Sequence, residues 1–158
     1  MKSIEKIVNW PSTLSLGEFP GEVAKWMDAR LMEDIIFQAR ESTGVPMWPS
    51  KLERAHVRHE ASGSQHSTQN KTELSRAADF HVRDYGSLLK VMAHLEQNDA
   101  VGGVGLYFDT NTPMFHVDLM ASRGRRLVWV RTRDGDYVYR ENNFPRFYEV
   151  LAEQLETP

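Results

Sequence analysis

The sequence predicts an α+β domain with a small antiparallel sheet and flanking helices. Two kinds of periodicity support this. Apolar residues recur every three to four positions in some segments and alternate with polar residues in others. The expected helices cover residues 22–43 and 87–97, and the expected strands cover residues 76–82 and 114–120. A further strand signal is the turn dipeptide Asp134-Gly135, which lies between two strand-like runs as in a β-hairpin.

Residues 1–20 show neither periodicity and are interrupted by Pro11 and Pro20. We expect an irregular N-terminal arm that packs on the rest of the chain through Trp10. Because 158 residues suffice for one core and not for two comfortable ones, we treat residues 1–158 as a single domain.

The first expected helix, residues 22–43, carries an apolar stripe formed by Val23, Met27, Leu31 and Ile35. Gly44 follows as a stop signal, since glycine readily adopts the left-handed conformation that ends many helices. Residues 45–73 are then polar and rich in His and Arg. A loop of this length in a compact domain is usually functional or disordered, and the His and Arg content favours function.

The two expected strands each present one apolar and one ionisable face. In residues 76–82, Asp79 and His81 share the face opposite to Ala78, Phe80 and Val82. In residues 114–120, His116 and Asp118 share the face opposite to Phe115, Val117 and Leu119. The apolar faces are expected to form the core.

The segment between these strands contains the helix at 87–97, for which Asp84 or Ser87 is the expected N-cap. Residues 101–108 form a glycine-rich strand. It lacks the full dinucleotide-binding pattern and no Walker lysine follows it, so we do not expect a phosphate-binding loop.

The C-terminal part is expected to contain hairpin strands at 127–133 and 137–140 and a last helix capped by Asn142 or Asn143. The residues with helical spacing on its expected buried side are Phe144, Phe147, Leu151 and Leu155.

Composition limits the classes of partner. The net charge of -3 gives no general electrostatic reason to expect nucleic acid binding. No window approaches ~18 consecutive apolar residues, so no membrane span is expected, and the N-terminal residues do not form a secretory signal. The chain has no cysteine, so any metal site must use His and carboxylate ligands.

Three residues are candidate metal ligands: His66 in the polar loop, Asp79 on one strand and His116 on another. Two His and one carboxylate can hold a zinc ion and leave its fourth position open to water. If the two strands are neighbours, these groups meet, and a metal ion compensates the cost of burying them. A His-x-Asp pair on a strand is also common at protein surfaces, so spacing alone leaves both interpretations open.

These segments resemble the zinc D-alanyl-D-alanine peptidase family, which shares its fold with the hedgehog signalling domain and includes bacterial carboxypeptidases and phage endolysins. The family pattern is Ser-x-His-x-x-Gly-x-Ala-x-Asp, followed later by an apolar residue and a His, often as His-x-Asp. The matching segments here are Ser64-Gln65-His66, Ala77-Ala78-Asp79 and Phe115-His116-Val117-Asp118. The resemblance covers roughly residues 50–131 and implies a hedgehog/DD-peptidase-like fold with a metallopeptidase-like core.

By this resemblance, His66, Asp79 and His116 are the zinc ligands. An arginine upstream of the first His usually holds the carboxylate of the substrate in this family. Arg58 is the nearest match, and Arg54 is the second choice.

Two features depart from the family pattern. The first His and the Asp are usually seven positions apart, whereas His66 and Asp79 are thirteen apart, which implies a loop insertion. The family's general base stands three residues before the last His, where this chain has Pro113. Asp118 is the first substitute, because it shares a strand face with His116, and it would equally serve to orient a ligand. The other candidate bases are Asp109, His81 and Glu60.

The resemblance implies a zinc metallopeptidase that hydrolyses stem or cross-link peptides of peptidoglycan through a metal-activated water. Its motifs are similar to those of phage or prophage members, so we expect a cytoplasmic or virion-associated protein without nucleic acid or membrane partners. The alternative is a non-catalytic, hedgehog-like zinc-binding module of a phage or prophage particle, with a structural or cell-wall-binding role.

Overall fold

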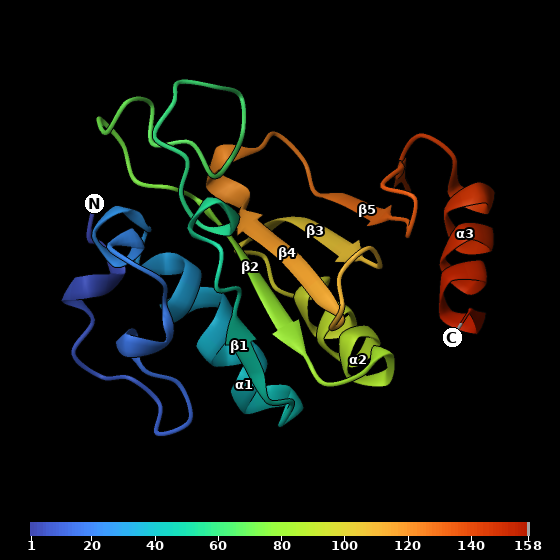
Figure 1. Cartoon of the computed structure of the whole chain (residues 1–158), viewed down its shortest axis with the longest axis horizontal. Helices are drawn as coiled ribbons and strands as arrows, with labels where there is room; N and C mark the ends of the chain where they lie inside the picture. The colour runs from blue at the N-terminus through green and yellow to red at the C-terminus, as the bar shows by residue number, and fades with distance from the viewer. Residues whose placement is uncertain (158) are drawn as a thin grey trace.

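The computed structural model describes residues 1–157 and has a six-stranded mixed sheet at its centre, in the order β1-β2-β4-β3-β5-β6 (Figure 1). The expected α+β class is confirmed. The strands are β1 (Met47–Pro49), β2 (Ala77–Val82), β3 (Val101–Tyr107), β4 (Met114–Leu119), β5 (Leu127–Arg131) and β6 (Tyr137–Tyr139).

Three α-helices accompany the sheet: α1 (Phe37–Thr43), α2 (Tyr85–Leu95) and α3 (Phe144–Glu156). A π-helix, η4 (Leu31–Ile36), runs directly into α1. The 3-10 turns are η1 (Ile4–Lys6), η2 (Leu16–Glu18), η3 (Val23–Trp26), η5 (Glu53–Ala55) and η6 (Met120–Ser122). Figure 1 shows α1 and α2 together on one side of the sheet and α3 next to β5.

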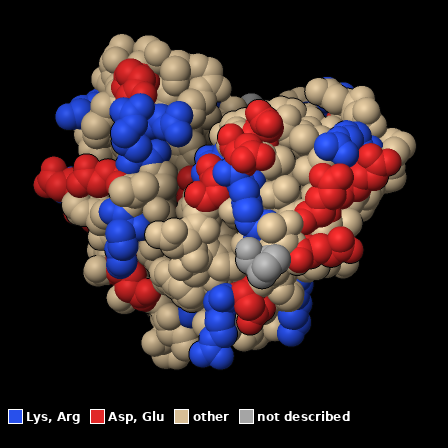
Figure 2. Space-filling view, turned by 45° about the vertical axis from the view of Figure 1, so that its right-hand side comes forward, with Lys and Arg blue, Asp and Glu red and all other residues tan. Residues whose placement is uncertain are grey.

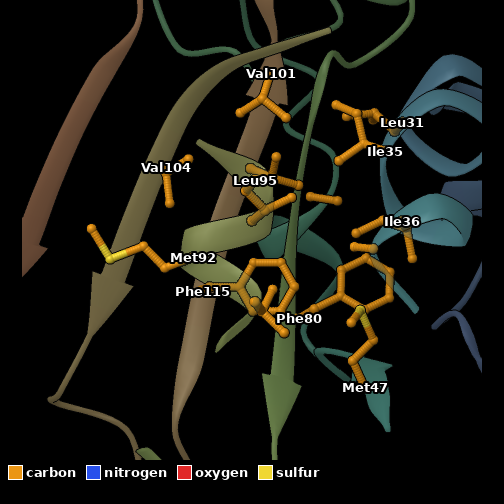
Figure 3. Packing of buried hydrophobic residues seen from close by; sticks show 14 of the residues in the cluster. Leu31, Ile35, Ile36, Met47, Phe80, Met92, Leu95, Val101, Val104 and Phe115 are labelled. Carbon is orange, nitrogen blue, oxygen red and sulfur yellow. The ribbon is translucent and has the colours of Figure 1, made fainter. Parts of the chain in front are cut away.

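The core lies between one face of the sheet and the helices. Phe80 of β2 and Phe115 of β4 are fully buried and stack with ring centroids 6.0 Å apart. Figure 3 shows Ile35 and Ile36 approaching these rings from one side, with Leu95 of α2 close by. The apolar strand faces expected from alternation are therefore confirmed as core. The opposite face of β2 and β4 carries the ionisable residues.

The sheet differs from the expected antiparallel one at a single pairing. β3 and β5 run parallel, whereas the other neighbouring strands are antiparallel. The reason is that β4 is already paired on both edges, with β2 and β3, so β5 adds to the free edge of β3. The chain returns there through η6 and a connection in which Arg126 donates to the Val101 carbonyl.

The prediction of one continuous helix over residues 22–43 is wrong in the middle of this segment. Residues 27 and 28 are not helical, because Asp28 donates its backbone N–H to the Ser75 carbonyl and the Met27 carbonyl accepts from Ile4. Met27 is buried, as the apolar stripe predicts. Its backbone, however, bonds to a segment distant in the chain and not to the next turn of a helix. The stop at Gly44 is confirmed, with a φ of 65°.

Of the alternatives given for each N-cap, the structure has Asp84, which accepts from the Ser87 N–H, and Asn143, which accepts from the Arg146 N–H. The prediction that Phe144 belongs to the buried side of α3 is wrong, because this side chain is 61% exposed. Phe144 is the first residue of α3, and its ring packs on Tyr148 with centroids 5.0 Å apart. Strand β1, within the expected loop 45–73, was not predicted.

Residues 1–20 contain two short turns, and Trp10 packs against Phe37 with ring centroids 5.3 Å apart. On the face shown in Figure 2, basic and acidic side chains are interspersed. None of the helices in residues 1–157 has both the length and the apolar character needed to cross a membrane.

The glycines of β3 leave room for side chains of neighbouring strands. A Cβ on Gly103 would lie 2.4 Å from a carboxylate oxygen of Asp118, and a Cβ on Gly105 would lie 2.5 Å from the indole ring of Trp129. Close side-chain approach therefore explains Gly103 and Gly105, whereas a Cβ on Gly102 would lie 2.7 Å from the backbone carbonyl oxygen of Leu119.

Gly105→Ala should lower the free energy of unfolding by about 1–3 kcal/mol, because Trp129 must move to make room for the methyl group. Urea denaturation of the two proteins measures this. The control is Gly63→Ala, since no atom lies within 4 Å of a Cβ there, and it should change stability by less than about 0.5 kcal/mol. Equal effects of the two changes would contradict the packing explanation.

Candidate metal centre

The register of β2 and β4 brings two predicted ligands together. Asp79 is the direct cross-strand partner of His116, and both residues lie on the sheet face opposite to the core. Directly opposed residues on one face have Cβ atoms about 4.5–5.5 Å apart, so their side chains meet without any special backbone geometry. The condition for the metal-site hypothesis, that the two strands are neighbours, is therefore met.

The third predicted ligand, His66, reaches the same place from the loop between η5 and β2. Its carbonyl accepts from the Arg58 N–H at 2.8 Å, and the Thr68 N–H donates to the Arg58 carbonyl at 2.8 Å. The end of the loop is fixed by Ser75, which donates its N–H to the Trp26 carbonyl. These bonds hold the backbone at His66 and on its C-terminal side.

The extra loop residues form a turn of their own. Three consecutive residues, Gln69, Asn70 and Lys71, adopt positive φ values of 48°, 59° and 67°. The Lys71 N–H donates to the hydroxyl of Thr68, which helps to close this turn. The longer spacing between His66 and Asp79 is thus compatible with a shared site.

The three side chains present one ligand atom each to a common point. His66 Nε2 lies 3.2 Å from His116 Nδ1 and 3.6 Å from Asp79 Oδ1, and His116 Nδ1 lies 2.9 Å from Asp79 Oδ1. Two ligands of a tetrahedral ion with bonds of ~2.0–2.1 Å are about 3.3 Å apart. The triangle therefore has the size of one face of a tetrahedral coordination shell, and the three buried residues can hold a metal ion.

Hydrogen bonds alone do not account for this triangle. His116 Nδ1 can carry a single proton, and that proton can point to Asp79 or to His66 but not well to both. A cation in the centre would interact with all three atoms at once. The open side of the triangle would then be available to water or to a substrate.

The outer nitrogen of His116 is held by a second pair of residues. His116 Nε2 donates to Asp118 Oδ2 at 3.0 Å, and Arg123 donates to both oxygens of Asp118 at 2.7 and 2.6 Å. A proton on Nε2 leaves Nδ1 free to bind a metal ion. Asp118 and Arg123 thus fix both the tautomer and the ring orientation of His116, as outer residues of metal sites commonly do.

The candidate ligands differ in their protonation near pH 7. Burial lowers the pKa of His66 to about 4, so its ring is neutral near pH 7. Burial also disfavours charged His116, but hydrogen bonds to Asp118 and Asp79 outweigh it and raise the pKa of His116 to about 9. Burial opposes ionisation of Asp79, yet the bond from His116 and the charges of both histidines keep its pKa below the usual value.

Asp118 lies on the side of His116 away from the triangle. It is fully buried, and its oxygens are bonded to His116 and Arg123, which keep its pKa low against the effect of burial. Of the two roles considered for it, general base and orienting residue, the contacts support the orienting one.

Arg58 is half-buried and borders the cleft in front of the triangle. No carboxylate among residues 1–157 lies within ion-pair distance of its guanidinium. Arg54, the second choice, is exposed and pairs with Glu60 at 2.9 Å. Arg58 is therefore better placed than Arg54 to meet an anionic ligand.

Several residues at the site were not singled out from the sequence. Trp129 of β5 lies across Gly105 from His116, with ring centroids 5.0 Å apart, and Tyr139 of β6 follows at 5.8 Å from Trp129. Arg123, which binds Asp118, is another of these residues. Strand alternation could have grouped Trp129 with Arg131, but the sequence gives no register that aligns them with His116.

Comparison of the chain with protein-family models, with curated proteins and with solved structures gives no match.

Asp118→Asn should weaken metal affinity about 10- to 100-fold, because the amide no longer holds His116 with its proton on Nε2. Competition with a chromophoric chelator measures the dissociation constant of Zn²⁺. The control is Asp109→Asn, which removes a carboxylate that pairs with Arg131 and not with a predicted ligand. A variant with unchanged metal affinity would favour the general-base role for Asp118.

Metal binding should release about one proton per chain at pH 7, because His116 with a pKa of about 9 carries a proton on Nδ1 that the metal must replace. Affinity should rise about tenfold per pH unit from pH 6 to pH 8 and level off near pH 9. His66 adds no pH dependence to the metal affinity between pH 6 and pH 9, since its pKa is about 4. Calorimetry in buffers of different ionisation enthalpy counts the protons, and a count near zero would contradict this assignment.

Proposed function

We propose that the protein is a zinc metallopeptidase that hydrolyses stem or cross-link peptides of peptidoglycan. The observation that carries the proposal is the triangle formed by His66 Nε2, Asp79 Oδ1 and His116 Nδ1. The resemblance to the D-alanyl-D-alanine peptidase family supplies the substrate class, the hedgehog/DD-peptidase-like fold and the phage or prophage setting. A cytoplasmic or virion-associated location belongs to the same proposal.

The donor set suits zinc. Two imidazoles and a carboxylate with one open position form the ligand set of many hydrolytic zinc sites. Zinc bound there would polarise the scissile carbonyl and lower the pKa of a bound water toward ~7. The protein's contribution is to hold His66 by its loop and to hold His116 through Asp118 and Arg123.

Arg58 is proposed to bind a carboxylate of the substrate. Its guanidinium can donate two parallel hydrogen bonds to a carboxylate, which fixes both position and orientation. It lines the cleft together with Asp79 and His66. A substrate held in this way would have its scissile carbonyl close to the open side of the triangle.

The three further base candidates differ in position. Asp109 is bonded to Arg131 at 2.8 Å, and Glu60 is bonded to Arg54. His81 is two residues from Asp79 on the same strand face and lines a hollow that reaches Asp79. Its Nδ1 donates to the Thr112 carbonyl at 3.2 Å, so Nε2 is its remaining nitrogen.

A non-catalytic module is the second candidate, and Pro113 favours it. Pro113 occupies the position of the family's general base, and its carbonyl accepts from the Val82 N–H, which ties the ends of β2 and β4 together. In this alternative the centre binds zinc for structure or for cell-wall recognition and no bond is cleaved.

Digestion of purified peptidoglycan should require bound metal. Activity should disappear with a chelator and return with Zn²⁺, and His116→Ala should remove both activity and stoichiometric zinc. The products, separated by chromatography, identify the bonds cleaved. One zinc per chain without cleavage of any wall fragment would contradict the peptidase and support the non-catalytic module.

Arg58→Ala should lower kcat/KM about ten- to a hundredfold through loss of the charge-assisted bonds to the substrate, with zinc content unchanged. Arg146→Ala is the matched control, because Arg146 is exposed, pairs with Glu149 and does not line the cleft, and it should retain nearly full activity. Equal losses in the two variants would argue against a specific carboxylate contact at Arg58.

A further inference from the structure

Two hollows meet at the candidate metal centre. The first has a volume of about 480 Å³ and contains Trp48, Leu52 and Met114 among its lining residues. The second has a volume of about 240 Å³ and contains Tyr107, Trp129 and Tyr139. Arg58, Asp79 and Arg131 line both hollows, so the two are parts of one groove.

The hollows extend toward opposite edges of the sheet. Trp48 belongs to β1, at one edge, and Tyr139 belongs to β6, at the other. Asp79 and His116 lie on β2 and β4, between these edges. The groove therefore crosses the strands, with the candidate metal centre part-way along it.

Each hollow has an exposed apolar or aromatic residue in its lining. Leu52, which lines the first hollow, is 71% exposed, and Tyr137, which lines the second, is 50% exposed. A carboxypeptidase needs room for a single terminal residue on one side of the scissile bond. Here the larger hollow alone has the size of sites that enclose whole small ligands.

We propose that the groove binds a peptide on both sides of the scissile bond, so that the bond cleaved is internal and the protein acts as an endopeptidase. This inference rests on the proposed peptidase function and specifies its substrate. In the hydrolysis, the C–N bond breaks, the carbonyl carbon gains the oxygen of water as a new carboxylate, and the nitrogen takes a proton and leaves as an amine.

The charges along the groove indicate which peptides fit. Arg58 and Arg131 both border the candidate metal centre. The guanidinium carbon Cζ of Arg131 also lies 3.8 Å from the ring centroid of Tyr107. Asp109 pairs with Arg131 on its outer side. Because Arg131 is already paired with Asp109, Arg58 is the guanidinium group that favours a peptide with a carboxylate close to the scissile bond, as branched or cross-linked acidic peptides have.

The decisive experiment compares two substrates for the zinc-loaded protein: a cross-linked peptide dimer, in which the bond has residues on both sides, and the monomeric peptide with a free terminal residue. Mass spectrometry of the products should show cleavage of the dimer and at least tenfold slower release of the terminal residue. Release of the terminal residue alone would overturn the endopeptidase assignment and leave the peptidase proposal standing. Cleavage of neither would overturn both.

A binding experiment tests the two-sided groove without turnover. The two halves of the cleaved dimer are titrated separately into the protein, with isothermal calorimetry as the readout. Trp48→Ala should weaken binding of one half and Tyr137→Ala binding of the other, each about three- to tenfold, as expected for the loss of one aromatic contact.

Phe144→Ala is the matched control, since Phe144 is an exposed aromatic residue that lines neither hollow, and it should bind both halves as the unchanged protein does. If Trp48→Ala and Tyr137→Ala weaken the same half, or if only one half binds, the substrate occupies one side of the centre and the inference is wrong.

Discussion

The candidate metal centre depends on the pairing register between β2 and β4, which brings two of the three candidate ligand atoms together. Asp79 faces His116 directly across the strand pair, so their side chains meet on the solvent side of the sheet. A shift of one residue would turn one of them into the core. The stacked rings of Phe80 and Phe115, one position further along on the other face, hold this register, so that core packing and ligand geometry support each other.

The same constraint explains the unusual sequence around the site. Burying His116 between two carboxylates requires that each carboxylate has further partners, and Arg123 fulfils this for Asp118 with two hydrogen bonds. The space for this arrangement comes from β3, where Gly103 clears Asp118 and Gly105 clears Trp129. A glycine-rich strand beside the ligands is therefore part of the site and not a phosphate-binding loop.

Much of this arrangement could be predicted from sequence, because it follows from periodicity. Alternation placed Asp79 and His116 on the face opposite to the core, and turn and cap residues marked α2 and β5–β6. Long-range pairing could not be predicted: the parallel contact of β3 with β5 and the break in the first helix at Met27 arise from partners distant in the chain. For the same reason the sequence did not single out Arg123 for Asp118 or align Trp129 with His116.

Anomalous diffraction from a crystal of the zinc-loaded protein tests the central claim most directly. The account predicts one strong zinc peak bonded to His66 Nε2, Asp79 Oδ1 and His116 Nδ1 at ~2.0–2.2 Å. Asp118 should remain hydrogen-bonded to His116 Nε2. A zinc-loaded crystal without a peak at this position, or with the imidazole of His66 or His116 turned away from Asp79, would contradict it.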